Sequence, residues 1–328
     1  MHSPFTILTN MYEILPYSPD MESRWDRFIV EESMNGTFLQ TRRFLNYHPD
    51  GRFTDASFVV EKSGIIVAAI PGCNIKGKFV SHQGSTFGGP VLSKDFYSGN
   101  KISEIIQVID NHLVQNFNGI KLKPTSPIFA TAPTDLIDYT LEHQNYKRHT
   151  ELSCFTPLVQ GSDPLETCTR ECRHNFRQAE KLDLTYGEIP DSEMEKFYEF
   201  LTLSKARHNT KPVHSLAELR DLKQRFPEEI LFRGIWKEGL YLSGMMIFYF
   251  KQAKAFHFQY LAPDDTKRKT NATTALFINA MREAVQTGCE KFSWGISTED
   301  GGAYLNENLY RFKESFGALP CVNARYEK

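Results

Sequence analysis

The same succession of apolar runs and turns occurs twice along this chain of 328 residues, and this repeat limits the folds that the chain can adopt. In each half, two short apolar runs flank a turn of the form Lys-x-Gly, and a third run, a loop, a helical segment, a glycine and a final run follow. Apolar runs flanked by glycine are typical of antiparallel hairpins, and a helix followed by a further strand gives a mixed α and β pattern. The predicted strands are 56–60, 65–71, 78–82 and 120–122 in the first half, and 230–236, 242–250, 255–260 and 291–295 in the second.

Each half also contains one helix that the spacing of apolar residues predicts. Residues 102–117 place isoleucine and leucine at helical intervals before Gly119, and residues 275–286 form the corresponding helix before Gly288. A Gly-Ser-Asp-Pro stretch at 161–164 has turn chemistry and predicts the boundary between the halves. We therefore expect the α/β (α+β) class, as a tandem repeat of two mixed-sheet domains at residues 1–160 and 161–328.

The composition excludes several classes of protein. The net charge of −2 gives no global basic field that would favour nucleic acid, and six cysteines are too few for a disulfide scaffold in a chain of this length. The apolar run 241–250 is far shorter than the ~20 residues that span a bilayer. Residues 1–6 lack the charged and apolar regions of a signal peptide, so we expect a cytoplasmic protein with reduced thiols.

Five segments, in order along nearly the whole chain, resemble the FemAB-like branch of the GNAT acyltransferase superfamily. The last of them is Phe312-Lys-Glu-Ser-Phe-Gly317, which follows the glycine-led strand 288–295. The others are Thr-Phe-Leu-Gln-Thr at 37–41, Gly-Ser-Thr-Phe-Gly-Gly-Pro at 84–90, an Arg-x-Asn-x-Arg-x-Ala-x-Lys-like helix at 173–181, and Leu-Ser-Lys-Ala-Arg at 203–207. The resemblance implies a tandem of GNAT-type folds and an acyltransferase activity.

The resemblance places the pair Phe312 and Lys313 close to the acyl-transfer centre. Acyl transfer builds negative charge on a carbonyl oxygen, and a fixed cation stabilises that charge. We therefore expect Lys313 in a cleft of the second domain, with Phe312 and Phe316 as apolar walls. The alternative is an ordinary solvated surface lysine.

Two arginines are candidates for binding a phosphate-bearing substrate. The resemblance implies that Arg207, at a helix end, contacts the diphosphate of a sugar-nucleotide acceptor, which suits a planar guanidinium. The sequence departs from the family's Thr-x-x-Arg-Asp pattern here, and a helix-terminal arginine can also simply meet the helix dipole. Arg173 shares a helix face with Arg177 and Lys181, and that face lies either against phosphate or in solvent.

Three further residues are candidates for contacts with the acceptor. His82 stands at a predicted strand end beside a glycine-rich loop, where an imidazole could take a proton from the attacking amine. Gln259 and Tyr260 occupy the matching place in the second half and are candidates for substrate binding. Structural roles, a hydrogen-bonded histidine and core packing, are the alternatives.

The loop 267–274 corresponds to the pyrophosphate loop of GNAT enzymes, which usually has the pattern Gln/Arg-x-x-Gly-x-Gly/Ala. The glycines are missing from this chain, but three cations and small residues precede a helix start, which attracts anions. The predicted cofactor-binding residues are Lys267, Arg268, Asn271 and Thr273. The alternative is a basic loop whose helix is capped by Asn271 or Thr273.

Other site chemistries find no support in the sequence. Cys168, Cys172 and His174 have no second cysteine pair at a zinc spacing, so we expect no metal site. The loop 84–90 lacks the Gly-Lys-Ser/Thr ending of a phosphate-binding P-loop, and no Gly-x-Ser-x-Gly elbow occurs. We expect direct transfer without a covalent enzyme intermediate, and no tightly bound cofactor.

The interpretation is an N-acyltransferase that moves an acyl group, from acyl-CoA as co-substrate, to an amino group on a cell-envelope saccharide or peptidoglycan precursor. The acceptor would be a sugar-nucleotide or a lipid-linked amino-sugar or peptide. One alternative is a peptidoglycan interpeptide ligase that uses aminoacyl-tRNA, which the absence of a long coiled-coil arm and of basic charge disfavours. The other is a non-catalytic binding protein with a degenerate GNAT fold.

Overall fold

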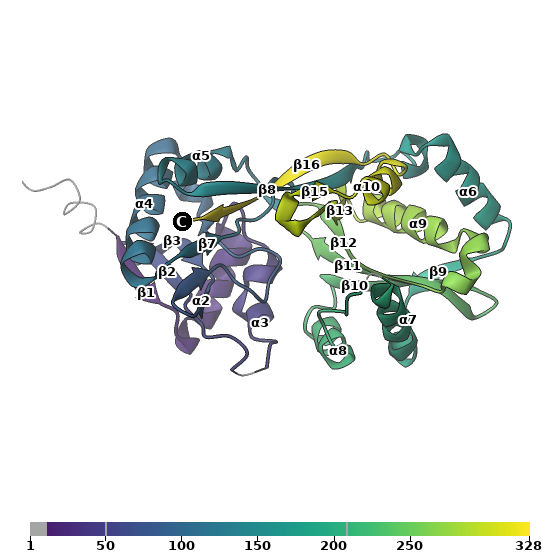
Figure 1. Cartoon of the computed structure of the whole chain (residues 1–328), viewed down its shortest axis with the longest axis horizontal. Coiled ribbons are helices and arrows are strands. Elements are labelled where there is room, and N and C mark those ends of the chain that lie inside the picture. Colours follow the sequence, from purple (N-terminus) through teal and green to yellow (C-terminus); the bar gives the residue numbers. More distant parts are fainter. Residues whose placement is uncertain (1–11, 50, 208) are drawn as a thin grey trace, which may run out of the picture. The chain divides into compact units, whose positions relative to one another are not determined.

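The computed structural model describes residues 12–49, 51–207 and 209–328, and it divides the chain into two compact units (Figure 1). The first unit is Met1–Glu151 with Val322–Lys328, and the second is Leu152–Cys321. The division falls earlier than the expected one at residue 160, because the second unit uses a strand that precedes the Gly-Ser-Asp-Pro stretch. The expectation about a signal peptide concerns residues 1–6, which lie outside the described part of the chain.

The first unit contains an antiparallel sheet in the order β1-β2-β3-β6 and a second group of strands in the order β4-β5-β7-β16. Helix α4 packs the apolar residues Ile102, Ile105, Ile106 and Ile109 into the core of this unit, as its helical spacing predicts. The strands are β1 (Glu13–Pro16), β2 (Phe58–Lys62), β3 (Ile65–Ile70), β4 (Cys73–Ile75), β5 (Lys78–Val80), β6 (Val91–Leu92), β7 (Ile120–Leu122) and β16 (Leu319–Glu327), and the helices are α2 (Glu22–Arg27), α3 (Arg42–Leu45), α4 (Gly99–Asn116) and α5 (Asp135–His143).

The second unit is built on one sheet in the order β8-β13-β12-β11-β10-β9, with helices on both faces. Figure 1 shows α6 and α9 on one side of this sheet and α7 and α8 on the other. The strands are β8 (Lys147–Pro157), β9 (Thr185–Glu188), β10 (Ile230–Lys237), β11 (Leu240–Phe250), β12 (Ala255–Pro263), β13 (Lys291–Ile296), β14 (Thr298–Glu299) and β15 (Tyr304–Leu305), and the helices are α6 (Arg170–Glu180), α7 (Met194–Ala206), α8 (Leu216–Arg225), α9 (Ala272–Gln286) and α10 (Glu307–Glu314).

The two Lys-x-Gly turns have the same backbone conformation. Ser63 and Gly64 have φ of 52° and 77°, and Glu238 and Gly239 have φ of 50° and 77°. Two successive residues with positive φ give the tight hairpin turn that matches the twist of paired strands. These turns join β2 to β3 and β10 to β11, so the hairpins predicted in both halves are present.

Strands β12 and β13 separate shortly after they begin. They run parallel and pair at Ala255 with Lys291, at Phe256 with Phe292 and at His257 with Ser293. Beyond these residues, β12 continues to Pro263 beside β11, with a bulge at Gln259, while β13 continues beside β8. The sheet of the second unit is therefore opened between two neighbouring parallel strands, on the side where β12 leads into α9.

Candidate functional site

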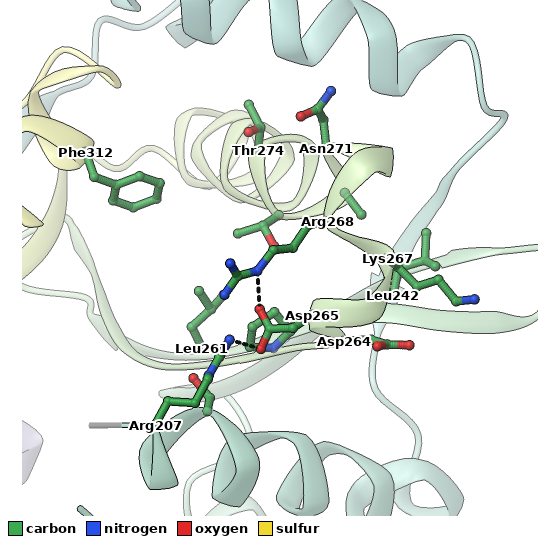
Figure 2. Close-up of a pocket in the computed structure, with 14 residues that line it drawn as sticks. Arg207, Leu242, Leu261, Asp264, Asp265, Lys267, Arg268, Asn271, Thr274 and Phe312 are labelled. Carbon is green, nitrogen blue, oxygen red and sulfur yellow. Dashed lines mark hydrogen bonds and ion pairs between the residues drawn. The ribbon is translucent and has the colours of Figure 1, made fainter. Parts of the chain in front are cut away.

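A pocket of about 350 Å³ lies in the second unit at the N-terminal end of α9 (Figure 2). Its wall combines the end of α7, the last residues of β12, the 3₁₀ helix η8 (Asp265–Thr270), the first turn of α9 and one aromatic side chain from α10. The lining residues are Ser204, Arg207, Leu242, Leu261, Pro263, Asp264, Asp265, Lys267, Arg268, Asn271, Ala272, Thr273, Thr274 and Phe312.

The polar centre of the pocket is Asp265, whose carboxylate lies between two guanidinium groups. Arg207 forms an ion pair with Oδ2, and Nε of Arg268 donates to Oδ1 at 2.7 Å (Figure 2). Burial alone would raise the pKa of Asp265, but hydrogen bonds and charge from the two arginines outweigh it, so the pKa lies below its usual value. Asp265 is therefore ionised at neutral pH and holds both arginines in place.

The backbone around the pocket is formed without the glycines of the GNAT pattern. Asn271 takes the left-handed conformation, with φ of 54°, between η8 and α9, and asparagine tolerates this region better than most residues. Asp264 begins η8 by accepting hydrogen bonds from the amide and hydroxyl of Thr266 at 3.0 and 2.7 Å. Helix α9, 15 residues long, thus points the positive end of its dipole at the pocket.

The pocket brings together residues that the sequence assigns to two different ligands. Arg207, predicted for the acceptor, and Lys267, Arg268, Asn271 and Thr273, predicted for the cofactor, all line it. In Figure 2, Lys267 points away from the group formed by Arg207, Asp265 and Arg268. A binding role for each of these five residues stays a prediction, but their grouping around one cavity is a property of the fold.

Lys313 is buried, with 2% of its surface exposed. Its ammonium donates to the carbonyl oxygens of Gly295 and Ile296 at 2.9 and 2.6 Å, and to Oγ of Ser297 at 2.9 Å. These three bonds use all three donors of the ammonium. Burial lowers the pKa of Lys313 to about 8, although the nearby thiols Cys154 and Cys321 act in the opposite direction. The position is therefore not that of an ordinary surface lysine.

The pocket lining contains Phe312 and not Lys313, so the side chain expected in the cleft lies next to a lining residue instead. Phe312 is 38% exposed, whereas Phe316, expected as a second wall, is buried in the core at 1%. The rings of Phe277 and Trp294 hold both, with centroids 5.8 Å from Phe277 to Phe312 and 5.0 Å from Trp294 to Phe316. This aromatic packing fixes α10, and with it the depth of Lys313.

A row of polar side chains lies along β12 where this strand separates from β13. Of these side chains, the sequence analysis predicted only Gln259 and Tyr260. Nδ1 of His257 lies 3.0 Å from Oγ of Ser293, and Nδ1 of His214 lies 2.7 Å from Oη of Tyr260. The side chain of Gln259 hydrogen-bonds to both His257 and Tyr260. The available signal was the alternation of His257 and Gln259 on a predicted strand, which places polar groups along it.

His257 is neutral at physiological pH, because burial lowers its pKa to about 4. Its ring packs against Gly295, where an added β carbon would lie 3.4 Å from Cε1 of the imidazole. The carbonyl of Gly295 in turn accepts a hydrogen bond from Lys313. His257 and Lys313 thus both contact Gly295, which has φ of 70° near the end of β13.

The remaining candidates lie elsewhere. His82 belongs to the first unit, accepts a hydrogen bond from the amide of Gly84 at 3.2 Å, and has its pKa lowered to about 4 by burial. Arg173 donates to the carbonyl oxygens of Glu166 and Cys168, just before its own helix. Gln259 and Tyr260 belong to the polar row and are not part of the pocket lining. The roles predicted for these residues stay predictions.

Among solved structures, the chain is similar to the crystal structure of FemX, with a TM-score of 0.72, 11% sequence identity and 96% of each chain covered. It is also similar to L-PGS from Bacillus licheniformis, with a TM-score of 0.57, 11% identity and coverage of 94% of this chain and 91% of the other. A tandem GNAT protein from the clavulanic acid biosynthesis pathway gives a TM-score of 0.53, 11% identity and coverage of 97% and 98%. No protein-family model and no curated protein matches the sequence.

These likenesses confirm the predicted fold class. The chain has a mixed α/β fold of the tandem GNAT type, and the resemblance to the FemAB-like branch holds at the level of the fold. Within residues 12–49, 51–207 and 209–328, none of the helices combines the length and the apolar character needed to cross a membrane.

Proposed function

We propose that the chain is an N-acyltransferase that uses acyl-CoA and binds the phosphates of this donor in the pocket at the start of α9. The observation that carries the proposal is the position of the pocket. Leu261 and Pro263, which line it, belong to the part of β12 that no longer pairs with β13, so the pocket lies beside the stretch where the two parallel strands have separated. Solved structures with the tandem GNAT fold support the same assignment.

The pocket offers the two kinds of surface that such a donor needs. Arg207, Arg268 and the N-terminal end of α9 are positive and suit phosphate oxygens. Leu261 and Phe312 are apolar and suit the aliphatic part of the donor. An extended thioester that enters along β12 would place its carbonyl near the end of β13, where Gly295 and Lys313 lie.

In the proposed reaction, the lone pair of the acceptor amine attacks the thioester carbonyl and forms a tetrahedral oxyanion. The C–S bond then breaks, the amide forms, and the proton released by the amine accompanies the departing thiol. Lys313 acts as a fixed charge near the developing oxyanion, and its water-excluded position leaves this charge weakly screened. Burial raises the pKa of Cys154 and Cys321, so neither thiol is activated as a nucleophile, which favours direct transfer.

We take the acceptor to be an amino group on a cell-envelope saccharide or peptidoglycan precursor, as the resemblance to the FemAB-like branch implies. The same branch includes ligases that use aminoacyl-tRNA, and the experiment must therefore include both donors. A cytoplasmic location is part of this proposal and stays a prediction.

The test is an acyl-transfer assay with the purified chain, a crude pool of envelope precursors, and either radiolabelled acetyl-CoA or charged tRNA. We expect label to pass from acetyl-CoA to the precursor fraction, and Arg268→Ala to reduce this transfer. Lys254→Ala is the control, because Lys254 is exposed and pairs with Glu290 outside the pocket lining. Transfer from charged tRNA alone would overturn the donor assignment, and CoA binding without any transfer would identify a binding protein.

A further inference from the structure

The ion pairs of Asp265 reveal a second property of the pocket, which concerns what a ligand must do in order to bind. One of the two guanidinium groups that Asp265 joins comes from Arg207, directly after α7, and the other comes from Arg268 in η8, so they are far apart in the sequence. Each carboxylate oxygen has its own arginine, Oδ2 with Arg207 and Oδ1 with Arg268 (Figure 2). The place where these cations converge is thus filled by an anion that belongs to the chain itself.

A carboxylate and a phosphate bind guanidinium groups in the same way, through pairs of oxygens in the plane of the donors. Asp265 therefore occupies the position at which a phosphate group would gain the contacts of both arginines. The pocket lining contains three cations, Arg207, Lys267 and Arg268, and two carboxylates, Asp264 and Asp265. A phosphate that entered without moving Asp265 would meet a negative charge instead of two positive ones.

The contacts of Asp265 are of the kind that can exchange. The exposed side-chain fractions are 38% for Arg207, 32% for Asp265 and 72% for Arg268. Ion pairs with this much solvent contact contribute little net stability, so replacing the carboxylate by a more highly charged anion carries a small penalty.

We propose that Asp265 competes with phosphate for Arg207 and Arg268, so that a phosphate-bearing ligand binds by displacing this carboxylate. The penalty is similar for every anion, so it lowers the affinity of each by a similar factor. At a given concentration, an anion with no further contacts, such as inorganic phosphate, therefore occupies the pocket less, whereas a ligand with several phosphates and an apolar arm has other contacts that offset the penalty. This proposal rests on the proposed function only in taking that ligand to be CoA.

Asp264 provides a matched control. It carries the same charge, is adjacent in sequence and lines the same pocket. Its carboxylate is engaged by the amide and hydroxyl of Thr266 rather than by the two arginines. Asp264→Asn therefore changes the net charge of the pocket lining as Asp265→Asn does, but leaves the contact between carboxylate and arginines in place.

The experiment measures the dissociation constants of inorganic pyrophosphate, CoA and phosphate-free pantetheine by calorimetry, for the wild type, Asp265→Asn and Asp264→Asn. We expect Asp265→Asn to bind pyrophosphate and CoA about three- to tenfold more tightly than the wild type, from the loss of two partly exposed ion pairs. Pantetheine should bind equally to all three proteins, and Asp264→Asn should change pyrophosphate binding by less than Asp265→Asn does. Thermal unfolding of each variant checks that the fold is retained.

Unchanged or weaker pyrophosphate binding by Asp265→Asn would overturn the proposal, because it would mean that Asp265 does not compete or that it positions the arginines for the ligand. An equal gain in Asp264→Asn would also overturn it, since net charge alone would then explain the effect. If pyrophosphate behaves as expected while CoA binds to none of the proteins, the exchange holds and the assignment of the donor fails.

Discussion

Three cations at or beside the pocket lie in two settings, which differ in whether a ligand can replace the partner of the charged group. Arg207 and Arg268 are partly exposed and share the carboxylate of Asp265, a partner that a ligand anion can replace. Lys313 is 2% exposed, and its ammonium is held by two backbone carbonyls and a hydroxyl. We infer from this comparison that the two settings have different roles. The arginines bind and release a ligand, whereas Lys313 supplies a charge that stays in one place.

The largest effect should come from removing the fixed charge. We expect Lys313→Met to lower turnover about a hundredfold, or ~3 kcal/mol, because it removes a preorganised charge from a developing oxyanion. The variant should also unfold more easily, by ~1–3 kcal/mol, since three buried acceptors lose their donor. Steady-state kinetics and thermal unfolding measure the two effects, and Lys254→Met is the control at an exposed lysine. Unchanged turnover in a folded variant would limit Lys313 to a structural role.

Removing an exchangeable charge should affect binding rather than chemistry. Arg207→Ala should raise the dissociation constant of CoA by about thirtyfold, from the loss of ~2 kcal/mol in a charge-assisted contact with phosphate. Turnover at saturating donor should change little. Arg220→Ala is the matched control, because Arg220 is 46% exposed, pairs with Glu195 and is not part of the pocket lining. Equal losses in both variants would show a general charge effect and would remove Arg207 from the proposed site.

The pH dependence should separate the two settings further. Burial lowers the pKa of Lys313 from 10.5 to about 8, so between these values the unfolded chain binds a proton at this site that the folded chain does not. Raising the pH through this window therefore favours the folded state, and the difference in stability between wild type and Lys313→Met should shift in favour of the wild type. Turnover should fall about tenfold between pH 7 and 9, because the charged form is lost. Turnover that follows stability upward would contradict a role for the charge.

The smallest effect should come from the glycine that meets both Lys313 and His257. Gly295 has φ of 70°, where a residue with a β carbon is strained by ~1–2 kcal/mol. We expect Gly295→Ala to lower the free energy of unfolding by that amount and to reduce turnover, because the carbonyl that holds Lys313 moves. Gly187→Ala, at a site with no heavy atom within 4 Å of the added carbon, is the control and should be close to neutral.

Local chemistry explains which parts of the fold were predictable. The Lys-x-Gly turns place two residues with positive φ in succession, and this requirement is visible in the sequence around Gly64 and Gly239. The boundary between the units depends instead on the strands with which β8 and β16 pair. Such pairing joins residues that are distant in the sequence, so a local pattern does not reveal it. The sequence therefore predicts the repeated hairpins but not the return of the last strand to the first unit.

The same distinction applies to the candidate site. Residues 267–273 form one loop, and their place at the start of a helix follows from the pattern of charges and small residues. The burial of Lys313 depends on carbonyls at the end of β13, and the bond between His214 and Tyr260 joins residues from different elements. The sequence did not predict a role for Asp265, because a single acidic residue in a basic loop does not indicate that two arginines will pair with it.

The return of the last strand has a consequence for how the protein is made. Residues 322–328 follow the whole second unit in the sequence, yet they belong to the first. Tyr326 and Glu327 pair with Leu122 and Lys121 of β7, and Nζ of Lys328 donates to the carboxylate of Asp110 at 2.8 and 2.9 Å. Until these residues are present, β7 lacks its neighbouring strand β16, so the first unit cannot complete its fold from residues 1–151 alone.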